Sequence, residues 1–186
     1  GIDREGPGLT TAESNLPEWL IARWRAAYGE ATVAGLALAA REEPATDLSL
    51  KPDLDATALA EALEGEILPG GTIRTGRRGD LASWPGFEDG VWWVQDAAAA
   101  VPVRLLAPKA GEQVVDFCAA PGGKTLQIAA SGASVVSLDR SAQRLKRLHE
   151  NLARTELKAE VVAVPAEDWE DDRTFDAVLL DAPCTA

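Results

Sequence analysis

The sequence predicts an α/β protein in which a small α+β module precedes an open parallel sheet covered by helices. Between residues 95 and 186, short apolar runs alternate with helical patterns, which is typical of buried parallel strands joined by crossover helices. The first of these runs, 113–117, leads into a turn of small residues with two glycines and then into a helix. A strand, a glycine-containing loop and a helix in that order predict a site for a nucleotide-like ligand.

The N-terminal half is predicted to hold three helices and four short strands. Residues 1–14 carry Gly, Pro, Thr and Glu without a period, so we interpret them as a linker, and we interpret residues 15–94 as one small α+β module. The helices are expected at 15–28, with Asn15 as the cap, and at 30–40 and 56–63. The strands are expected at 47–51, 66–68, 72–74 and 91–94.

Residues 95–186 are predicted to form the N-terminal part of the parallel-sheet domain. An alanine-rich helix is expected over 96–106. The strands are expected at 113–117, 134–138, 160–164 and 175–180, with helices at 124–131 and 141–154. Right-handed crossovers give the strand order 3-2-1-4, and ligands of such sheets bind at the carboxyl ends of the strands, beside the first strand.

Composition excludes several classes of function. The formal net charge is −12 and the sequence pI is near 4.5, which argues against broad non-specific binding of nucleic acid by lysine and arginine. No apolar run reaches the 18 residues of a membrane span, so no membrane partner is expected. Two cysteines and one histidine without ligand spacing predict no metal site. We expect a monomer in the reducing cytoplasm.

The two ends of the sequence suggest a piece of a longer protein. Methionine is absent even at position 1, and Ala186 follows directly on an apolar run and a turn. The alternative is a complete small domain that has lost its initiator. Four parallel strands leave the last one, 175–180, at an open sheet edge, so we expect residues 1–186 alone to be only marginally soluble.

Three features are expected to meet at the carboxyl edge of the sheet. The first is the loop 118–124. The second is Asp139, which closes the second strand about 20 residues beyond the loop, where an acid accepts the ribose hydroxyls of a nucleotide. The third is Asp181, at the end of the fourth strand. The loop matches neither G-x-G-x-x-G nor the ATPase pattern G-x-x-x-x-G-K-[ST], so an NAD-dependent dehydrogenase ranks low and no ATPase is predicted.

Two motifs carry a family resemblance. The stretch F-C-A-A-P-G-G-K-T at 117–125, with L-D-A-P-C-T at 180–185, resembles the S-adenosylmethionine-dependent RNA cytosine-C5 methyltransferases, and among them the RsmB-type (Sun/Fmu) ribosomal RNA enzymes. Residues 86–96 are similar to the segment that leads into that family's catalytic domain, and 15–20 to the start of its RNA-recognition-like module. The resemblance implies a Rossmann-like methyltransferase sheet, truncated after its fourth strand.

The resemblance also implies the chemistry. The cofactor would be S-adenosylmethionine, and the substrate a cytosine of ribosomal RNA, in 16S rRNA, methylated at C5. The loop would surround the methionine part of the cofactor, and Asp139 would bind its ribose. The implied cofactor-binding residues are Cys118, Ala119, Ala120, Pro121, Gly122, Gly123, Lys124, Asp139, Ala166, Glu167 and Asp181. An acid that reads adenine in the family falls here on Pro165, which leaves two alternatives: Glu167 or Asp168 substitutes if the loop bends, or the loop backbone recognises adenine.

Asp181 and Cys184 are the implied catalytic residues. In this family a cysteine thiolate adds to C6 of a base that has left its stack, and C5 then attacks the sulfonium methyl. The Asp181 carboxyl would balance charge near N3. The resemblance gives the nucleophile to a cysteine beyond Ala186 and gives Cys184 a part in product release, so this stretch alone is expected to be inactive. The alternative is a non-catalytic module that binds a cofactor or a protein, which the −12 charge and Pro165 favour.

Overall fold

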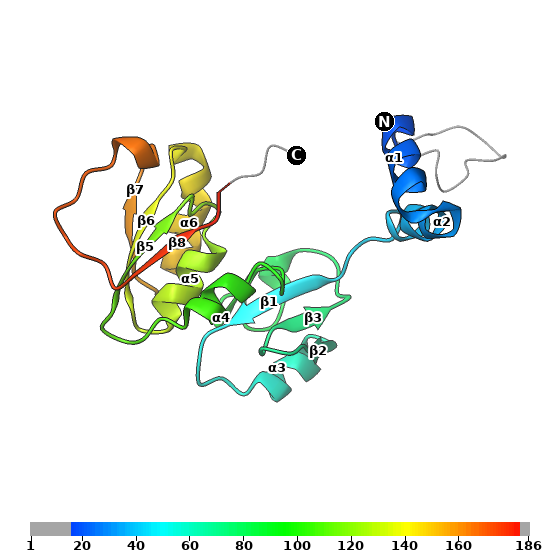
Figure 1. Cartoon of the computed structure of the whole chain (residues 1–186). Coiled ribbons are helices and arrows are strands. Elements are labelled where there is room, and N and C mark those ends of the chain that lie inside the picture. The colour runs from blue at the N-terminus through cyan, green and yellow to red at the C-terminus, as the bar shows by residue number, and fades with distance from the viewer. Residues whose placement is uncertain (1–15, 183–186) are drawn as a thin grey trace. The chain divides into compact units, whose positions relative to one another are not determined.

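The computed structural model describes residues 16–182, and its contacts divide the chain into two compact units, 1–44 and 45–186 (Figure 1). The first unit is a pair of helices, α1 (Glu18–Tyr28) and α2 (Glu30–Ala39). Gly29, with φ of +80°, ends one helix and begins the next. Pro17 occupies the N-cap position of α1, whereas the expected cap, Asn15, lies outside the described residues.

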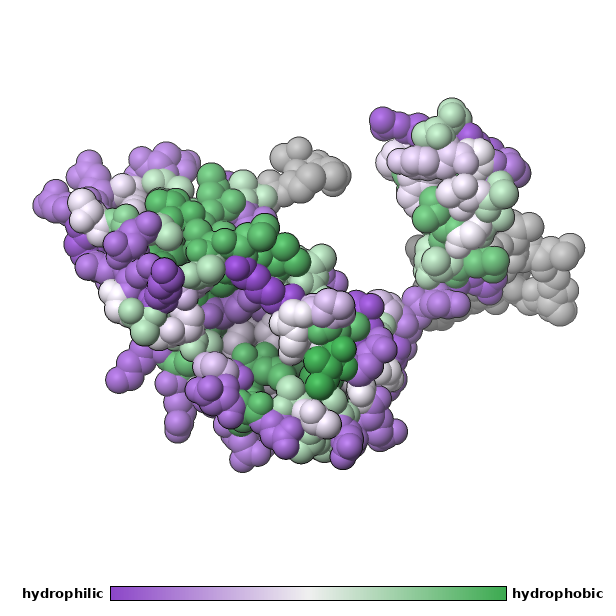
Figure 2. Space-filling model, turned by 60° about the horizontal axis from the view of Figure 1, so that its bottom comes forward, coloured by the Kyte–Doolittle hydropathy of each residue, from purple (hydrophilic) through white to green (hydrophobic). Residues whose placement is uncertain are grey.

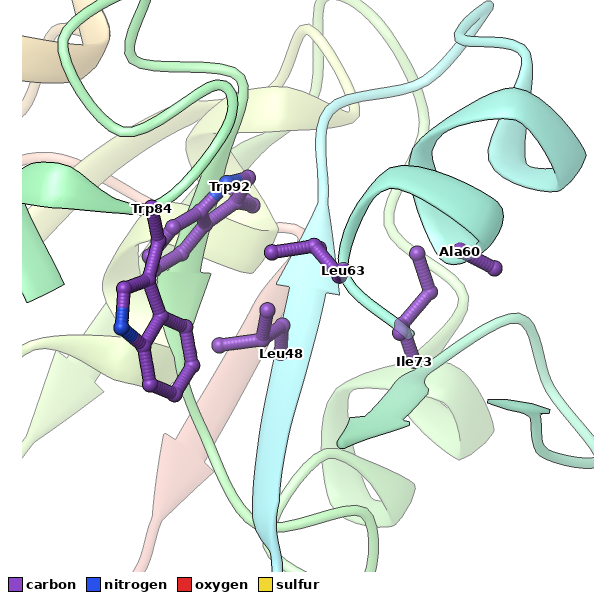
Figure 3. Packing of buried hydrophobic residues seen from close by; sticks show 6 residues of the cluster. All are labelled: Leu48, Ala60, Leu63, Ile73, Trp84 and Trp92. Carbon is purple, nitrogen blue, oxygen red and sulfur yellow. The ribbon is translucent and has the colours of Figure 1, made fainter. Parts of the chain in front are cut away.

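The second unit begins with an antiparallel sheet. Its strands are β1 (Thr46–Leu50), β2 (Gly65–Ile67), β3 (Ile73–Thr75) and β4 (Trp92–Val94), in the order β2-β3-β1-β4, with α3 (Ala56–Ala62) after β1. The Asp55 side chain caps α3 by accepting from the Thr57 and Ala58 amides. Leu48, Leu63 and Trp92 are fully buried in the core of this part, as Figure 3 shows.

The rest of the second unit is the parallel sheet. Its strands are β5 (Gln113–Phe117), β6 (Ser134–Leu138), β7 (Glu160–Val162) and β8 (Ala177–Leu180), and its helices are α4 (Val101–Leu106), α5 (Gly123–Ala130) and α6 (Ala142–Thr155). All pairings are parallel, and the order β7-β6-β5-β8 confirms the predicted 3-2-1-4. Two 3-10 turns, η2 (Leu81–Ser83) and η3 (Ala166–Asp168), lie in the connections.

The helix predicted over 96–106 is shorter than expected, because α4 begins only at Val101. Asp96 is the cause. Its Oδ1 accepts from the amides of Ala98 and Ala99, which forms a separate turn before the helix. The alanine run has high helix propensity, but this local cap and Pro102 in the first turn of α4 set the start of the helix.

Two strands also differ from their predicted bounds. β7 ends at Val162 instead of 164, and β8 begins at Ala177 instead of 175. The aromatic ring of Phe175 packs near Trp169, whose ring meets Phe117 edge-on at 5.6 Å between centroids. The apolar residues that flank the strands are partly buried by packing and not by strand pairing, so the apolar pattern in the sequence is longer than the strands.

Contacts join the two sheets into one unit. The Asp47 carboxylate receives two hydrogen bonds from Arg74 and one from the Ala97 amide, and the Arg74 guanidinium lowers the pKa of Asp47. Arg154 of α6 donates to the carbonyl oxygens of Phe87 and Trp92. Residues 15–94, interpreted from the sequence as one module, are thus divided between the two units, and the boundary at 94/95 stays a prediction.

The face shown in Figure 2 carries apolar residues in patches among hydrophilic ones. Strand β8 is an edge strand, and its Val178 and Leu180 are 56% and 64% exposed. This exposed edge agrees with the reason given for marginal solubility, which stays a prediction. Within residues 16–182, no helix has the length and apolarity needed to cross a membrane.

Candidate functional site

The loop between β5 and α5 is shaped by two residues with positive φ. Cys118 leaves β5 at φ +59° and Gly122 precedes α5 at φ +109°. A Cβ on Gly122 would lie 2.5 Å from Leu148 Cδ1, so only glycine lets the loop approach α6 this closely. The loop is therefore held between the end of β5 and the start of α5.

A cavity of about 570 Å³ opens beside this loop, at the carboxyl edge of the parallel sheet. Asp116 lies in its wall from β5, Arg144 from α6, and Asp181 just after β8. The remaining lining residues come from the loop, from the end of β4 and the segment after it, and from the segment after β8: Val94, Gln95, Asp96, Ala99, Cys118, Ala119, Ala120, Pro121, Gly123, Lys124 and Ala182.

Lys124 and Asp181 form an ion pair in this wall. Lys124 Nζ lies 2.6 Å from Asp181 Oδ2; the lysine side chain is only 17% exposed and the aspartate side chain 57%. Solvent reaches the carboxylate, so the pair contributes modestly to stability. The ion pair matters for position, because it places an ammonium and a carboxylate side by side in the cavity wall.

Asp116 is the most perturbed acid of the cavity. Burial raises the pKa of Asp116 to about 6, although Thr125 Oγ1 donates a 2.6 Å hydrogen bond to its Oδ2 and Lys124 lies nearby, both of which lower it. Ser137 Oγ donates to Thr125 Oγ1 in turn at 3.0 Å. Asp116 lies at the end of an apolar run, and its sequence context predicts no role for it.

Asp139 follows β6 directly, as expected, but it does not line the cavity. It is 4% exposed, and its carboxylate is occupied by protein donors: Oδ2 accepts from the Ala120 amide at 3.2 Å and Oδ1 from the Ser141 amide at 2.9 Å. Arg144 Nη1 lies 3.4 Å from Oδ2. Asp139 therefore lies behind the loop and does not line the cavity, and its expected contact with a ribose stays a prediction.

The other expected residues divide into three groups. Most of the loop, 118–121 with Gly123 and Lys124, lines the cavity together with Asp181. Gly122, Ala166 and Glu167 do not line it; the last two lie exposed in η3, after Pro165 at its N-cap position. Cys184 lies outside the described residues. Across residues 16–182, no group of three or more potential ligands that could hold a metal is found.

Sequence reasoning missed four polar residues of the wall: Gln95, Asp96, Asp116 and Arg144. Gln95 Oε1 accepts from the Trp93 indole, and its Nε2 donates to Gln127, which fixes the side chain. No periodicity marks such residues. Their signal was proximity to motifs, since Gln95 and Asp96 end the 86–96 stretch and Arg144 lies five residues after Asp139.

Comparison with known proteins gives a family match. A family model described as 16S rRNA methyltransferase RsmB/F matches residues 103–186. Ribosomal RNA small subunit methyltransferase B of Vibrio vulnificus is 45% identical over 139 residues, which cover 72% of this chain and 31% of that protein. The chain thus spans less than a third of the length of the curated relatives it matches.

Solved structures match in fold. A methyltransferase homolog protein from Pyrococcus horikoshii superposes with a TM-score of 0.71 at 24% identity, covering 94% of this chain and 62% of that one. NSun6 from Pyrococcus horikoshii, solved with SFG, gives a TM-score of 0.74 at 18% identity, covering 90% and 71%. At these identities the likeness speaks for the fold, and it confirms the predicted Rossmann-like methyltransferase sheet.

Proposed function

We propose that this chain, which matches the RsmB/F family of 16S rRNA methyltransferases over residues 103–186, carries the cofactor site of an RNA (cytosine-C5) methyltransferase. The family and its cofactor, S-adenosylmethionine, are as the sequence predicted. The proposal adds the finer points: the base is cytosine, the methylated atom is C5, and the RNA is 16S rRNA. We assign the activity to the whole protein, because the relatives are much longer than this chain.

The donor set of the cavity carries the proposal. S-adenosylmethionine has a carboxylate at one end of its methionine part and two cationic groups, an ammonium and a sulfonium. The cavity wall includes a cation suited to the carboxylate, Lys124, and acids suited to the cationic groups, Asp116 and Asp181. Its volume of about 570 Å³ lies within the range of small-molecule sites. Residues present therefore fit the cofactor.

Each residue then has a defined part. When bound, the cofactor supplies an electrophilic methyl group. The loop 118–123 excludes water and presents backbone to the methionine part, and Lys124 holds Asp181 in place by their ion pair. Asp181, at the solvent-facing side of the wall, faces the incoming cytosine and balances the charge that develops on its ring. Cys184 keeps its proposed part in product release.

Calorimetric titration with S-adenosylhomocysteine tests the site. We expect saturable one-to-one binding, weakened about tenfold or more by Lys124→Ala, because a charged contact is lost. Lys146→Ala on the exposed face of α6 is the matched control and is expected to leave binding unchanged. No binding at millimolar ligand, or tighter binding of NAD⁺ than of S-adenosylhomocysteine, contradicts the proposal.

Pro165 favours a second candidate, a non-catalytic module that binds the cofactor or a protein. At this position the side chain offers no acceptor for an adenine amino group, and the acids that follow it are exposed. Incubating the full-length protein with 16S rRNA and methyl-labelled cofactor separates the two functions. Label at C5 of a cytosine establishes the enzyme; cofactor binding without labelled RNA establishes the module.

A further inference from the structure

Arg144 contacts both the loop 118–124 and Asp139. It lies in the first turn of α6, where its amide donates to Ser141 Oγ. Its Nη2 donates to the Ala120 carbonyl oxygen at 2.6 Å, and its Nη1 lies 3.4 Å from Asp139 Oδ2. The same side chain lines the cavity of about 570 Å³.

These contacts hold Ala120 at both of its backbone polar groups. The amide donates to Asp139 Oδ2 and the carbonyl accepts from Arg144, while Arg144 and Asp139 pair with each other. A closed ring of three interactions therefore surrounds one buried residue in the middle of the loop. Asp139 is itself held by the Ser141 amide, so the ring is anchored to the start of α6.

We propose that Arg144 is a positioning residue that holds the loop 118–122 in its binding conformation through Ala120. The inference rests on the proposed function, because it assigns the loop to the methionine part of the cofactor. The loop needs such support: Cys118 has a positive φ that a non-glycine residue adopts at some cost. With Gly122 packed against Leu148, α6 then holds the loop at two points.

The shape of the guanidinium matters as well as its charge. Its planar fork directs one nitrogen at a carbonyl and another at a carboxylate, which a lysine ammonium on a single stem cannot reproduce in the same geometry. Arg144→Lys therefore keeps the charge and loses the bridge. Arg140→Gln removes a neighbouring exposed charge and leaves the bridge intact.

The experiment measures two ligands on four proteins. S-adenosylhomocysteine contains the methionine part, and adenosine lacks it. For Arg144→Gln we expect binding of S-adenosylhomocysteine to weaken about tenfold, and binding of adenosine to change less than about twofold. Arg144→Lys is expected to resemble Arg144→Gln, and Arg140→Gln the unchanged protein. Without ligand, hydrogen exchange of the Ala120 amide is expected to accelerate in both Arg144 variants.

Each other outcome has a definite meaning. Equal loss for both ligands assigns Arg144 a direct contact with the adenosine part and overturns the inference. Full binding by Arg144→Lys reduces its role to charge and overturns it too, as does unchanged hydrogen exchange at Ala120. If the unchanged protein binds neither ligand, the proposed function fails, which is distinct from failure at Arg144 alone. A thermal melt of each variant checks that it is folded.

Discussion

The loop after β5 and the turn after β7 are expected to bind opposite ends of one cofactor, yet they are built differently. The loop 118–124 is held by Asp139 and Arg144 and borders a cavity. The turn η3 is exposed, follows Pro165, and contributes no residue to that cavity. The segment proposed for the methionine end is therefore pre-organised by protein contacts, whereas the segment proposed for the adenine end is not.

Closing the space behind the loop is expected to have the largest effect. Gly122→Ala places a Cβ 2.5 Å from Leu148 Cδ1 at a φ of +109°, so the loop or α6 must shift. We expect the free energy of unfolding to fall by about 2–4 kcal/mol and cofactor binding to be lost. Calorimetry and denaturant unfolding measure both.

Gly111→Ala is the matched control for this change. Gly111 also has a positive φ, +86°, but nothing lies within 4 Å of an added Cβ. The control therefore isolates backbone strain from the clash, and we expect it to cost about 1 kcal/mol and to leave binding unchanged. Equal losses in the two variants would show that the approach of the loop to α6 is unimportant.

Ionisation of Asp116 is expected to have the second largest effect, on both stability and cofactor binding. Burial raises the pKa of Asp116 from 3.8 to about 6, so folding favours its neutral form. Its contribution to stability is present below pH 4 and is lost as pH rises through 6, by roughly 2–3 kcal/mol. Binding of the cationic cofactor has the opposite trend, because the ionised acid attracts it.

Titration of S-adenosylmethionine between pH 5 and 7.5 measures this trend. We expect affinity to rise several-fold across pH 6 in the unchanged protein, and the rise to disappear in Asp116→Asn. Asp96→Asn serves as control, since that acid also lines the cavity but is exposed. The same pH dependence in Asp116→Asn would assign it to another group.

The fold was largely predictable from the sequence, because its signals are local. The strands at 113–117 and 134–138 were predicted with their observed bounds, since buried parallel strands are continuous apolar runs. The strand order followed from crossover handedness. The start of α4 was not predictable from propensity, because the side chain of Asp96 competes with the helix for backbone amides.

The candidate site was predictable only as far as motifs mark it. Motifs located the loop and Asp181, both of which line the cavity. Arg144 and Asp116 were missed as site residues because their roles depend on contacts between elements far apart in the sequence, such as α6 with the loop. The hydrogen bond from the Ala120 amide to Asp139 is likewise a contact between segments that are distant in the sequence.

Adding an acid at the proposed adenine end is expected to have a smaller effect. Pro165→Asp supplies the acceptor that the resemblance places there, at the N-cap position of η3 where an aspartate is also favoured. We expect cofactor binding to tighten about three- to tenfold, with no change for the control Ala163→Asp on the exposed strand end. Weaker binding in Pro165→Asp would show that adenine lies elsewhere.

Removing the acids of η3 is expected to have the smallest effect of all. Glu167 and Asp168 are exposed and lie outside the cavity wall, so Glu167→Gln and Asp168→Asn each change binding of S-adenosylhomocysteine less than about twofold. A tenfold loss in either variant would mean that the turn folds onto the ligand and that this acid substitutes for the one missing at Pro165. The difference between the loop 118–124 and the turn η3 would then hold only for the free protein, because η3 would join the site when the ligand binds.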